Sequence, residues 1–228
     1  MIDRMEDLLP NVRWGEIAEA LGETLAMVSI ALVFTVALAL PLGILMYLTG
    51  KGQLRANPIV YGVVAFIVNI IRSVPFIILM IAVLPFTALL VGTTLGVAGA
   101  LPPMIIAATP FLARLVEIAL REVDHGLLEL GQSMAASTRQ IVSHILLPEA
   151  RPALLAAVTV TAIALIDYTA MSGVLGGGGL GDLAIRYGYQ RFQTDVMVLT
   201  IALQIILVQL IQFLGDRAVH RFSRSRRG

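Results

Sequence analysis

Long runs of residues without any charge dominate this chain and restrict its fold more than any other feature. The first run extends over 27 residues from Thr24 to Gly50, and the longest, between Arg72 and Arg114, has 41 uncharged residues. About 20 apolar residues in a helix cross the hydrocarbon core of a bilayer. The first run therefore predicts one membrane-spanning helix, whereas the second is too long for one crossing and has to fold back.

Composition excludes the main alternatives to a membrane protein. Of the 228 residues 58% are hydrophobic and 14% charged, whereas a soluble domain has roughly 25% charged residues. The absence of cysteine excludes a disulfide-rich secreted domain, and a net charge of +1 gives no excess for binding nucleic acid. The three histidines, His125, His144 and His220, lack metal-ligand spacing. We expect an all-α integral membrane protein without a bound metal.

Five transmembrane helices are expected within one transmembrane domain that covers residues 1–228. They are placed at about 24–48, 58–84, 98–117, 152–172 and 196–215, with an external N-terminal segment at 1–23, a cytoplasmic loop at 118–151 and a basic cytoplasmic tail at 216–228. The second is a long or kinked helix with its kink at Pro75, unless residues 58–71 lie partly at the interface. The fold-back falls in the glycine and proline cluster between Gly92 and Pro103.

The distribution of Lys and Arg predicts the orientation of these spans. Eleven of the 16 basic residues fall on one side, four on the other, and Arg72 lies within a span. Short cytoplasmic loops collect Lys and Arg, so the basic C-terminus is expected in the cytoplasm. Five crossings then place the N-terminus outside.

The cytoplasmic loop has the sequence signals of two short helices rather than of a flexible linker. Ser137 and Gln140 fit a capping box, which predicts a helix that starts near Thr138. This helix is expected to end before Pro148, because proline lacks the amide donor. A shorter helix is expected before it, at about 127–136. The alternatives for this loop are a helix-turn-helix look-alike and an amphipathic segment packed on the membrane.

The same loop resembles the EAA loop of ABC importer permeases, whose pattern is E-A-A, three residues, G, nine residues and I-x-L-P. The spacing is kept, but Leu130 and Gly131 replace the two alanines and Ala135 replaces the glycine. The resemblance implies a coupling helix that sits in a groove of a cytoplasmic ATPase. The implied coupling residues are Glu129, Leu130, Gly131, Ala135, Ser137, Ile145, Leu147 and Pro148.

Further blocks, among them those at residues 69–79, 108–114, 178–181 and 211–217, resemble the permease of methionine ABC importers. The resemblance implies the type I importer permease fold in a homodimer in the bacterial inner membrane. It also implies two ATPase subunits, which carry the ATP and Mg²⁺, and an extracytoplasmic methionine-binding lipoprotein. The chain itself is expected to bind no nucleotide and not to be an enzyme. Gly176, Gly178 and Gly181 form a G-x-G-x-x-G match that no strand precedes, so a close-packed, flexible external turn is the better interpretation.

Two charged residues lie within the predicted spans and are candidates for the translocation pathway. A charge in a spanning helix is costly and usually faces a cavity or a partner, which directs attention to Arg72 and Asp167. Pro75, Tyr168 and Met171 are grouped with them. The alternatives are that Arg72 reaches the interface and that Asp167 lies near the outer surface. The methionine-permease resemblance gives no support to Asp167, since that family tends to have glycine there.

The sequence thus predicts the permease subunit of an ATP-driven importer that forms a pathway for L- or D-methionine. Two alternatives stay open. The first is an ABC permease for another small solute, and the second is an ion-coupled secondary carrier, which would need intramembrane acids and internal repeats.

Overall fold

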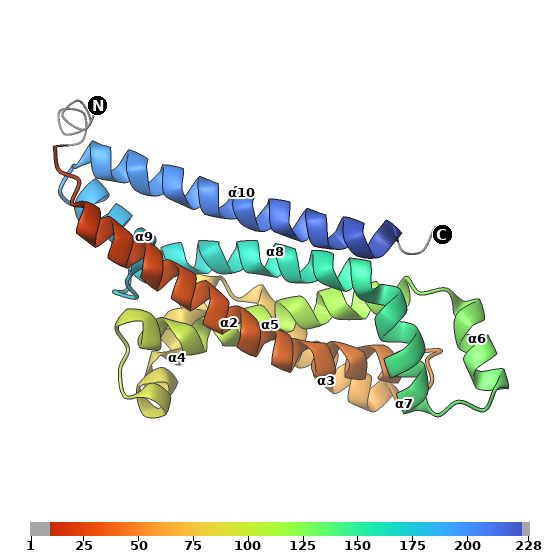
Figure 1. The fold of residues 1–228 in the computed structure, drawn as a ribbon. Helices are drawn as coiled ribbons and strands as arrows, with labels where there is room; N and C mark the ends of the chain where they lie inside the picture. Colours follow the sequence, from red (N-terminus) through yellow and green to blue (C-terminus); the bar gives the residue numbers. More distant parts are fainter. Residues whose placement is uncertain (1–9, 225–228) are drawn as a thin grey trace. The chain divides into compact units, whose positions relative to one another are not determined.

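The computed structural model describes residues 10–224, and every regular element in that range is helical (Figure 1). Four helical stretches, Trp14–Thr49, Gly96–Arg121, Thr138–Gly173 and Thr194–Phe222, are each long and apolar enough to cross a membrane, and a bent pair of shorter helices makes a fifth candidate. The predicted all-α membrane fold is confirmed. The elements are α2 (Trp14–Thr49), α3 (Pro58–Ser73), α4 (Phe76–Val91), α5 (Gly96–Arg121), α6 (His125–Ser133), α7 (Thr138–Gln140), η1 (Ile141–Leu146), α8 (Leu147–Gly173), α9 (Gly179–Leu183), η2 (Ala184–Tyr189) and α10 (Thr194–Arg224), where η marks a π-helix.

The second predicted span is divided in two. Helices α3 and α4 are separated by Val74 and Pro75 and bent by 109°. Pro75 is the N-cap of α4, and its carbonyl accepts from the amides of Ile78 and Leu79 at 3.0 Å. Because proline has no N–H and disfavours helical backbone at the residue before it, α3 ends there and α4 starts anew.

The predicted fold-back lies at the first glycines of the glycine and proline cluster. Helix α4 ends at Val91 and is capped by Gly92, whose φ of 76° is left-handed and whose amide bonds to Ala88 O. Helix α5 begins at Gly96 and contains both Pro102 and Pro103. At the N-terminus α2 begins at Trp14, so residues 14–23 continue into the first span. Residues 1–9 of the predicted N-terminal segment and 225–228 of the basic tail lie outside the described residues.

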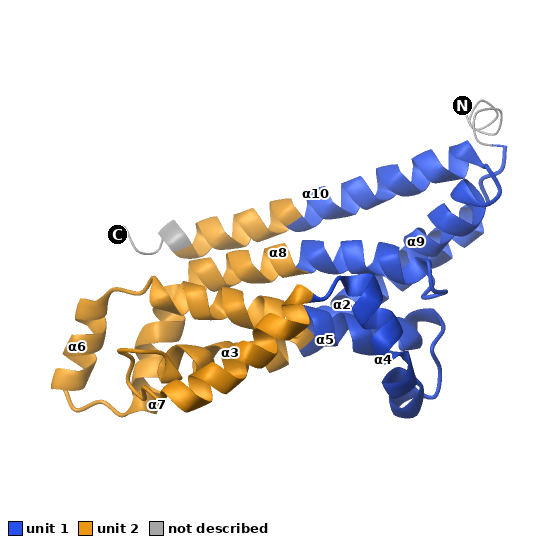
Figure 2. Cartoon of the chain, turned by 180° about the vertical axis from the view of Figure 1, so that it is seen from behind, with its two compact units in different colours: residues 1–34, 74–108, 162–211 blue, residues 35–73, 109–161, 212–228 orange. Residues whose placement is uncertain are grey.

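The chain divides into two compact units, which Figure 2 shows in different colours. Unit 1 comprises residues 1–34, 74–108 and 162–211. Its larger core is centred on three fully buried methionines, Met27 from α2, Met80 from α4 and Met104 from α5. Methionine adapts its shape to irregular gaps, which suits the meeting of three helices. These side chains are core residues.

Unit 2 comprises residues 35–73, 109–161 and 212–228. Its core joins α2, α5, α6, η1 and α8 through buried side chains such as Tyr47, Leu120, Leu128 and Leu146. Helices α2 and α5 approach closely in this unit, because a Cβ added at Gly43 would lie 2.6 Å from the carbonyl oxygen of Ala113. The loop predicted at residues 118–151 belongs wholly to unit 2.

Candidate functional site

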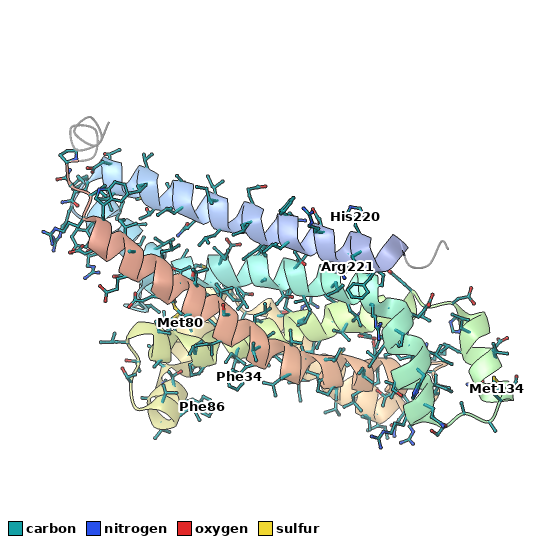
Figure 3. The ribbon with its side chains drawn as sticks, in the orientation of Figure 1. Phe34, Met80, Phe86, Met134, His220 and Arg221 are labelled. Atoms are coloured by element: carbon teal, nitrogen blue, oxygen red, sulfur yellow. The ribbon has the colours of Figure 1, made fainter. Side chains whose placement is uncertain are left out.

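Helix α6 stands at the edge of unit 2 (Figures 1 and 2), and three apolar side chains form an exposed stripe along it. Asp124 caps its N-terminus, since its carboxylate accepts from the amide of Gly126 at 2.6 Å. Leu128 faces inward and is buried in the core of unit 2. Leu130 is 58% exposed and Met134 74% exposed, and Figure 3 shows Met134 beyond the end of α6. Leu127, one turn earlier, extends this stripe.

The turn after α6 is a Schellman motif with alanine at its left-handed position. Ala135 has a φ of 55°. Its amide bonds to Gln132 O at 2.9 Å, and the amide of Ala136 bonds to Gly131 O at 3.1 Å. This pair of bonds closes a helix C-terminus at a residue that is usually glycine, because a Cβ is strained there. The geometry explains why the importer pattern has glycine where this chain has Ala135.

The predicted capping box at Ser137 is confirmed. The Ser137 hydroxyl accepts from the amide of Gln140 at 3.4 Å, and the Gln140 side chain accepts from the amide of Ser137 at 2.8 Å. The predicted start of a helix at Thr138 is therefore correct.

The prediction that this helix ends before Pro148 is wrong. The helix runs without interruption from Thr138 to Gly173. Residues Ile141–Leu146 form a π-helix, in which the amide of Leu147 bonds to Val142 O, five residues back. The wider turn redistributes the backbone hydrogen bonds in front of the proline, so the missing N–H of Pro148 does not stop the helix.

Two of the predicted coupling residues pack against one another inside the loop rather than toward a partner. Gly131 is buried, and a Cβ added there would lie 2.8 Å from Ile145 Cδ1 and 3.4 Å from Ile141 Cγ1. Ile145 and Leu147 are partly buried against the core of unit 2. Pro148 is half-buried, whereas Glu129 is exposed beside Leu130. The small residue at 131 thus brings α6 close to η1.

The pathway candidates lie in both units. Arg72 is exposed in the last turn of α3, in unit 2. Asp167, Tyr168 and Met171 lie on α8 in unit 1, where Asp167 and Met171 are exposed one turn apart. The ring of Tyr168 stacks on Phe76 of α4 with centroids 4.2 Å apart. A pairing of Arg72 with Asp167 stays a prediction.

The glycine-rich segment after α8 packs closely in unit 1, as the sequence predicts. A Cβ added at Gly173 would meet the backbone nitrogen of Asp182, and one added at Gly181 would lie 2.5 Å from Ala170 Cα. From α2, the Glu23 carboxylate accepts from the amide of Gly179 at 2.6 Å. The amide of Leu180 donates to Thr24 Oγ1 at 2.9 Å. The glycines therefore serve close packing and the capping of α9.

Asp182 lines a cavity of about 330 Å³ beside the first turns of α2 in unit 1. Burial raises the pKa of Asp182, and the nearby Glu23 also raises it, against the opposing effect of Arg186. Arg186 forms an ion pair with Asp182 at 2.6 Å. Among the residues that the structure describes, no group of three or more His, Cys, Asp or Glu side chains is suited to hold a metal ion.

Sequence reasoning missed one cluster, which surrounds a buried carboxylate in α5. Glu117 accepts from Arg114 at 2.5 Å and from Arg121 at 2.7 Å, and Tyr61 of α3 donates to it at 3.1 Å. The i−3 and i+4 spacing of the two arginines was visible in the sequence. The contact with Tyr61, 56 residues away, was not.

Comparison with known proteins agrees with the predicted permease family. A family model described as the binding-protein-dependent transport system inner membrane component matches residues 39–228. The probable D-methionine transport system permease protein MetI of Vibrio cholerae is 46% identical and aligns over 94% of this chain and 92% of its own. The methionine import system permease protein MetP of Bacillus subtilis is 49% identical over 92% of this chain and 95% of its own.

Solved structures lead to the same conclusion. A chain from the inward-facing MetNI methionine ABC transporter superposes with a TM-score of 0.90 at 45% identity and covers 92% of this chain and 97% of that one. An amino acid ABC transporter at 15% identity and a TM-score of 0.75 shares the fold. The resemblance to the methionine permeases is thus confirmed. The chain belongs to the family of inner membrane components of binding-protein-dependent transport systems.

Proposed function

We propose that this chain is the membrane-spanning subunit of an ATP-driven importer and forms the path by which methionine, in its L- or D-form, crosses the bacterial inner membrane. The relatives named for methionine transport, which align over more than nine-tenths of the chain, support the substrate. The single structural observation that carries the proposal is the exposed apolar stripe of α6.

This stripe has the properties of a docking element. Leu130 and Met134 are exposed on a short helix whose two ends are fixed, by Asp124 at the start and by the Ala135 turn at the end. An exposed apolar stripe on a capped helix fits a hydrophobic groove of another protein. The occupant proposed here is a cytoplasmic ATPase subunit that binds and hydrolyses Mg²⁺–ATP, a reaction that we do not assign to this chain.

The complete importer comprises two copies of this chain, two ATPase subunits and an extracytoplasmic methionine-binding lipoprotein, embedded in lipid. The excess of basic residues at one set of loops supports a cytoplasmic C-terminus and an external N-terminus. In this assembly ATP-driven approach of the ATPase subunits pulls the two copies of α6 together. The permeases respond by opening the path to the outside, where the binding protein delivers methionine.

For the path itself, we propose that Arg72, Asp167, Tyr168 and Met171 line it, with Pro75 at the bend between α3 and α4. Arg72 and Asp167 are exposed; Arg72 is the one charged residue of α3, and Asp167 is the one charged residue of α8 after Arg151. Charged groups within a membrane span are expensive unless they face water or a partner. A zwitterionic amino acid meets both of these charges, so neither of its own charges is buried without compensation.

The test is ATP-dependent uptake of radiolabelled methionine into proteoliposomes that contain the whole complex. In the variant Leu130→Asp we expect loss of ATPase binding and of uptake, because a carboxylate enters the apolar contact. The matched control Gln132→Asp adds the same charge on the opposite face of α6 and keeps both activities. Uptake without the ATPase would refute the proposal in favour of an ion-coupled carrier. Uptake of other solutes in preference to methionine would refute the substrate.

A further inference from the structure

Glu117 is a carboxylate with a 1% exposed side chain in a membrane-spanning helix. Such a group is tolerated only with its charge compensated and its oxygens hydrogen-bonded. Arg114 and Arg121 place two positive charges beside the one negative charge of Glu117, from positions one turn before and one turn after it on α5. Their own side chains are 34% and 38% exposed, so the excess charge is hydrated while the carboxylate is not.

The cluster also joins α5 to two neighbouring helices of unit 2. Tyr61, in the first turn of α3, donates to Glu117 Oε1 at 3.1 Å, and Arg114 donates to the Tyr61 hydroxyl at 3.3 Å. The guanidinium of Arg121 lies against the end of α2, where a Cβ added at Gly50 would be 2.7 Å from Arg121 Nη2. The ends of α3 and α5 therefore meet at one carboxylate, and the end of α2 lies against Arg121, one of its two ion-pair partners.

This junction lies at the base of α6. Arg121 is the last residue of α5, and Asp124, the N-cap of α6, follows three residues later. Leu120 and Leu128, on either side of this connection, are buried in the same core. A displacement of α6 consequently reaches Arg121 through a connection of only three residues.

We propose that Glu117 is a positioning residue for transport, which holds the ends of α2, α3 and α5 as one body through Arg114, Arg121 and Tyr61. A pull on α6 then moves three helices together instead of bending the connection after α5. The inference rests on the proposed function, because it assigns the cluster a part in the step that links ATP hydrolysis to uptake.

A purely structural role predicts a different result. A buried ion pair that only stabilises the chain affects the amount of folded protein, but each folded complex then couples normally. A positioning role lowers the number of methionine molecules imported per ATP hydrolysed in complexes that are folded and bound to the ATPase. The ratio of uptake to ATP hydrolysis therefore separates the two roles.

The experiment uses the whole complex in proteoliposomes and compares four variants with the wild type. Glu117→Gln keeps the size but removes the charge, and Glu117→Asp restores the charge on a shorter side chain. Tyr61→Phe removes both hydrogen bonds of the Tyr61 hydroxyl and leaves both ion pairs. Glu122→Gln removes an exposed acid just after α5 and is the matched control.

In Glu117→Gln we expect ATPase binding to persist and the uptake-to-hydrolysis ratio to fall about tenfold. Glu117→Asp recovers at least half of the wild-type ratio, Tyr61→Phe lowers it about two- to threefold, and Glu122→Gln leaves it unchanged. A wild-type ratio in Tyr61→Phe, together with a wild-type ratio in those Glu117→Gln complexes that fold, overturns the inference. If Glu117→Gln does not fold, an unchanged ratio in Tyr61→Phe alone overturns it. A wild-type complex without ATP-dependent uptake contradicts the proposed function instead.

Discussion

The left-handed backbone at Ala135 gives a prediction whose magnitude follows from the structure. At a φ of 55° an L-residue is strained by about 1–2 kcal/mol. Glycine avoids this strain but loses roughly 0.5–1 kcal/mol more conformational entropy on folding. Ala135→Gly should therefore stabilise the turn after α6 by about 0.5–1 kcal/mol, because the first effect outweighs the second.

Hydrogen exchange on the purified complex measures this difference where it arises. The amides of Ala135 and Ala136 close the turn, so their protection reports its local opening. The expected gain is roughly two- to fivefold in protection, since about 1.4 kcal/mol corresponds to a factor of ten. Uptake should be retained, as glycine is the residue of the importer pattern at this position.

The control is Ala136→Gly, one residue later, where the backbone φ is not positive. Glycine relieves no strain there and only adds disorder to the unfolded turn, so protection should fall. Equal changes in the two variants, or a loss of protection in Ala135→Gly, would show that strain at Ala135 is not what limits this turn.

Three further predictions concern the packing, the capping and the charge of the described residues. Gly173→Ala places a Cβ against the backbone of Asp182 and should destabilise the folded chain by more than about 2 kcal/mol, as measured by thermal unfolding. In the control Gly22→Ala the added Cβ meets nothing within 4 Å, so this variant should be neutral or more stable by up to about 1 kcal/mol. Ser137→Ala should cost about 1 kcal/mol of local stability, seen as faster exchange of the Gln140 amide. Burial raises the pKa of Asp182 above its ordinary 3.8, so the folded protein loses stability as the pH rises from about 4 and this carboxyl ionises. Asp182→Asn should match the wild type in stability below that pH and become the more stable of the two above it. A stability difference that is constant across pH would contradict this.

Local signals in the sequence predicted the parts of this fold that depend on local chemistry. The capping box at Ser137 needs only a hydroxyl side chain and, three residues later, the side chain of Gln140, and both can be read directly from the sequence. The turn at Gly92 and the division at Pro75 follow in the same way from a left-handed residue and a missing amide. Long apolar runs predicted the helices, because the backbone in lipid has to satisfy its own hydrogen bonds.

Features that depend on distant contacts or on irregular backbone were not predictable in this way. The rule that proline ends a helix failed at Pro148, because in the π-helix over Ile141–Leu146 the backbone amides bond to carbonyls five residues back instead of four. Nothing near Glu117 in the sequence indicates Tyr61 as its third partner. The inward direction of Gly131 depends on where Ile145 lies, which periodicity over so short a helix does not give.

The two departures from the importer pattern at 130 and 131 become intelligible once their directions are known. Position 131 faces η1 at a distance that leaves little room for a side chain, so a residue smaller than alanine is accommodated there. Position 130 is 58% exposed, so a larger side chain is accommodated there, and leucine adds apolar area to the exposed stripe of α6. The contact of α6 with η1 therefore requires a small residue at 131, whereas the exposed face of α6 accepts a large one at 130. Under the proposed docking, a partner groove that accepts Leu130 has to be wider at this point than one shaped for alanine, so we predict that Leu130 is a position at which this permease and its ATPase are matched.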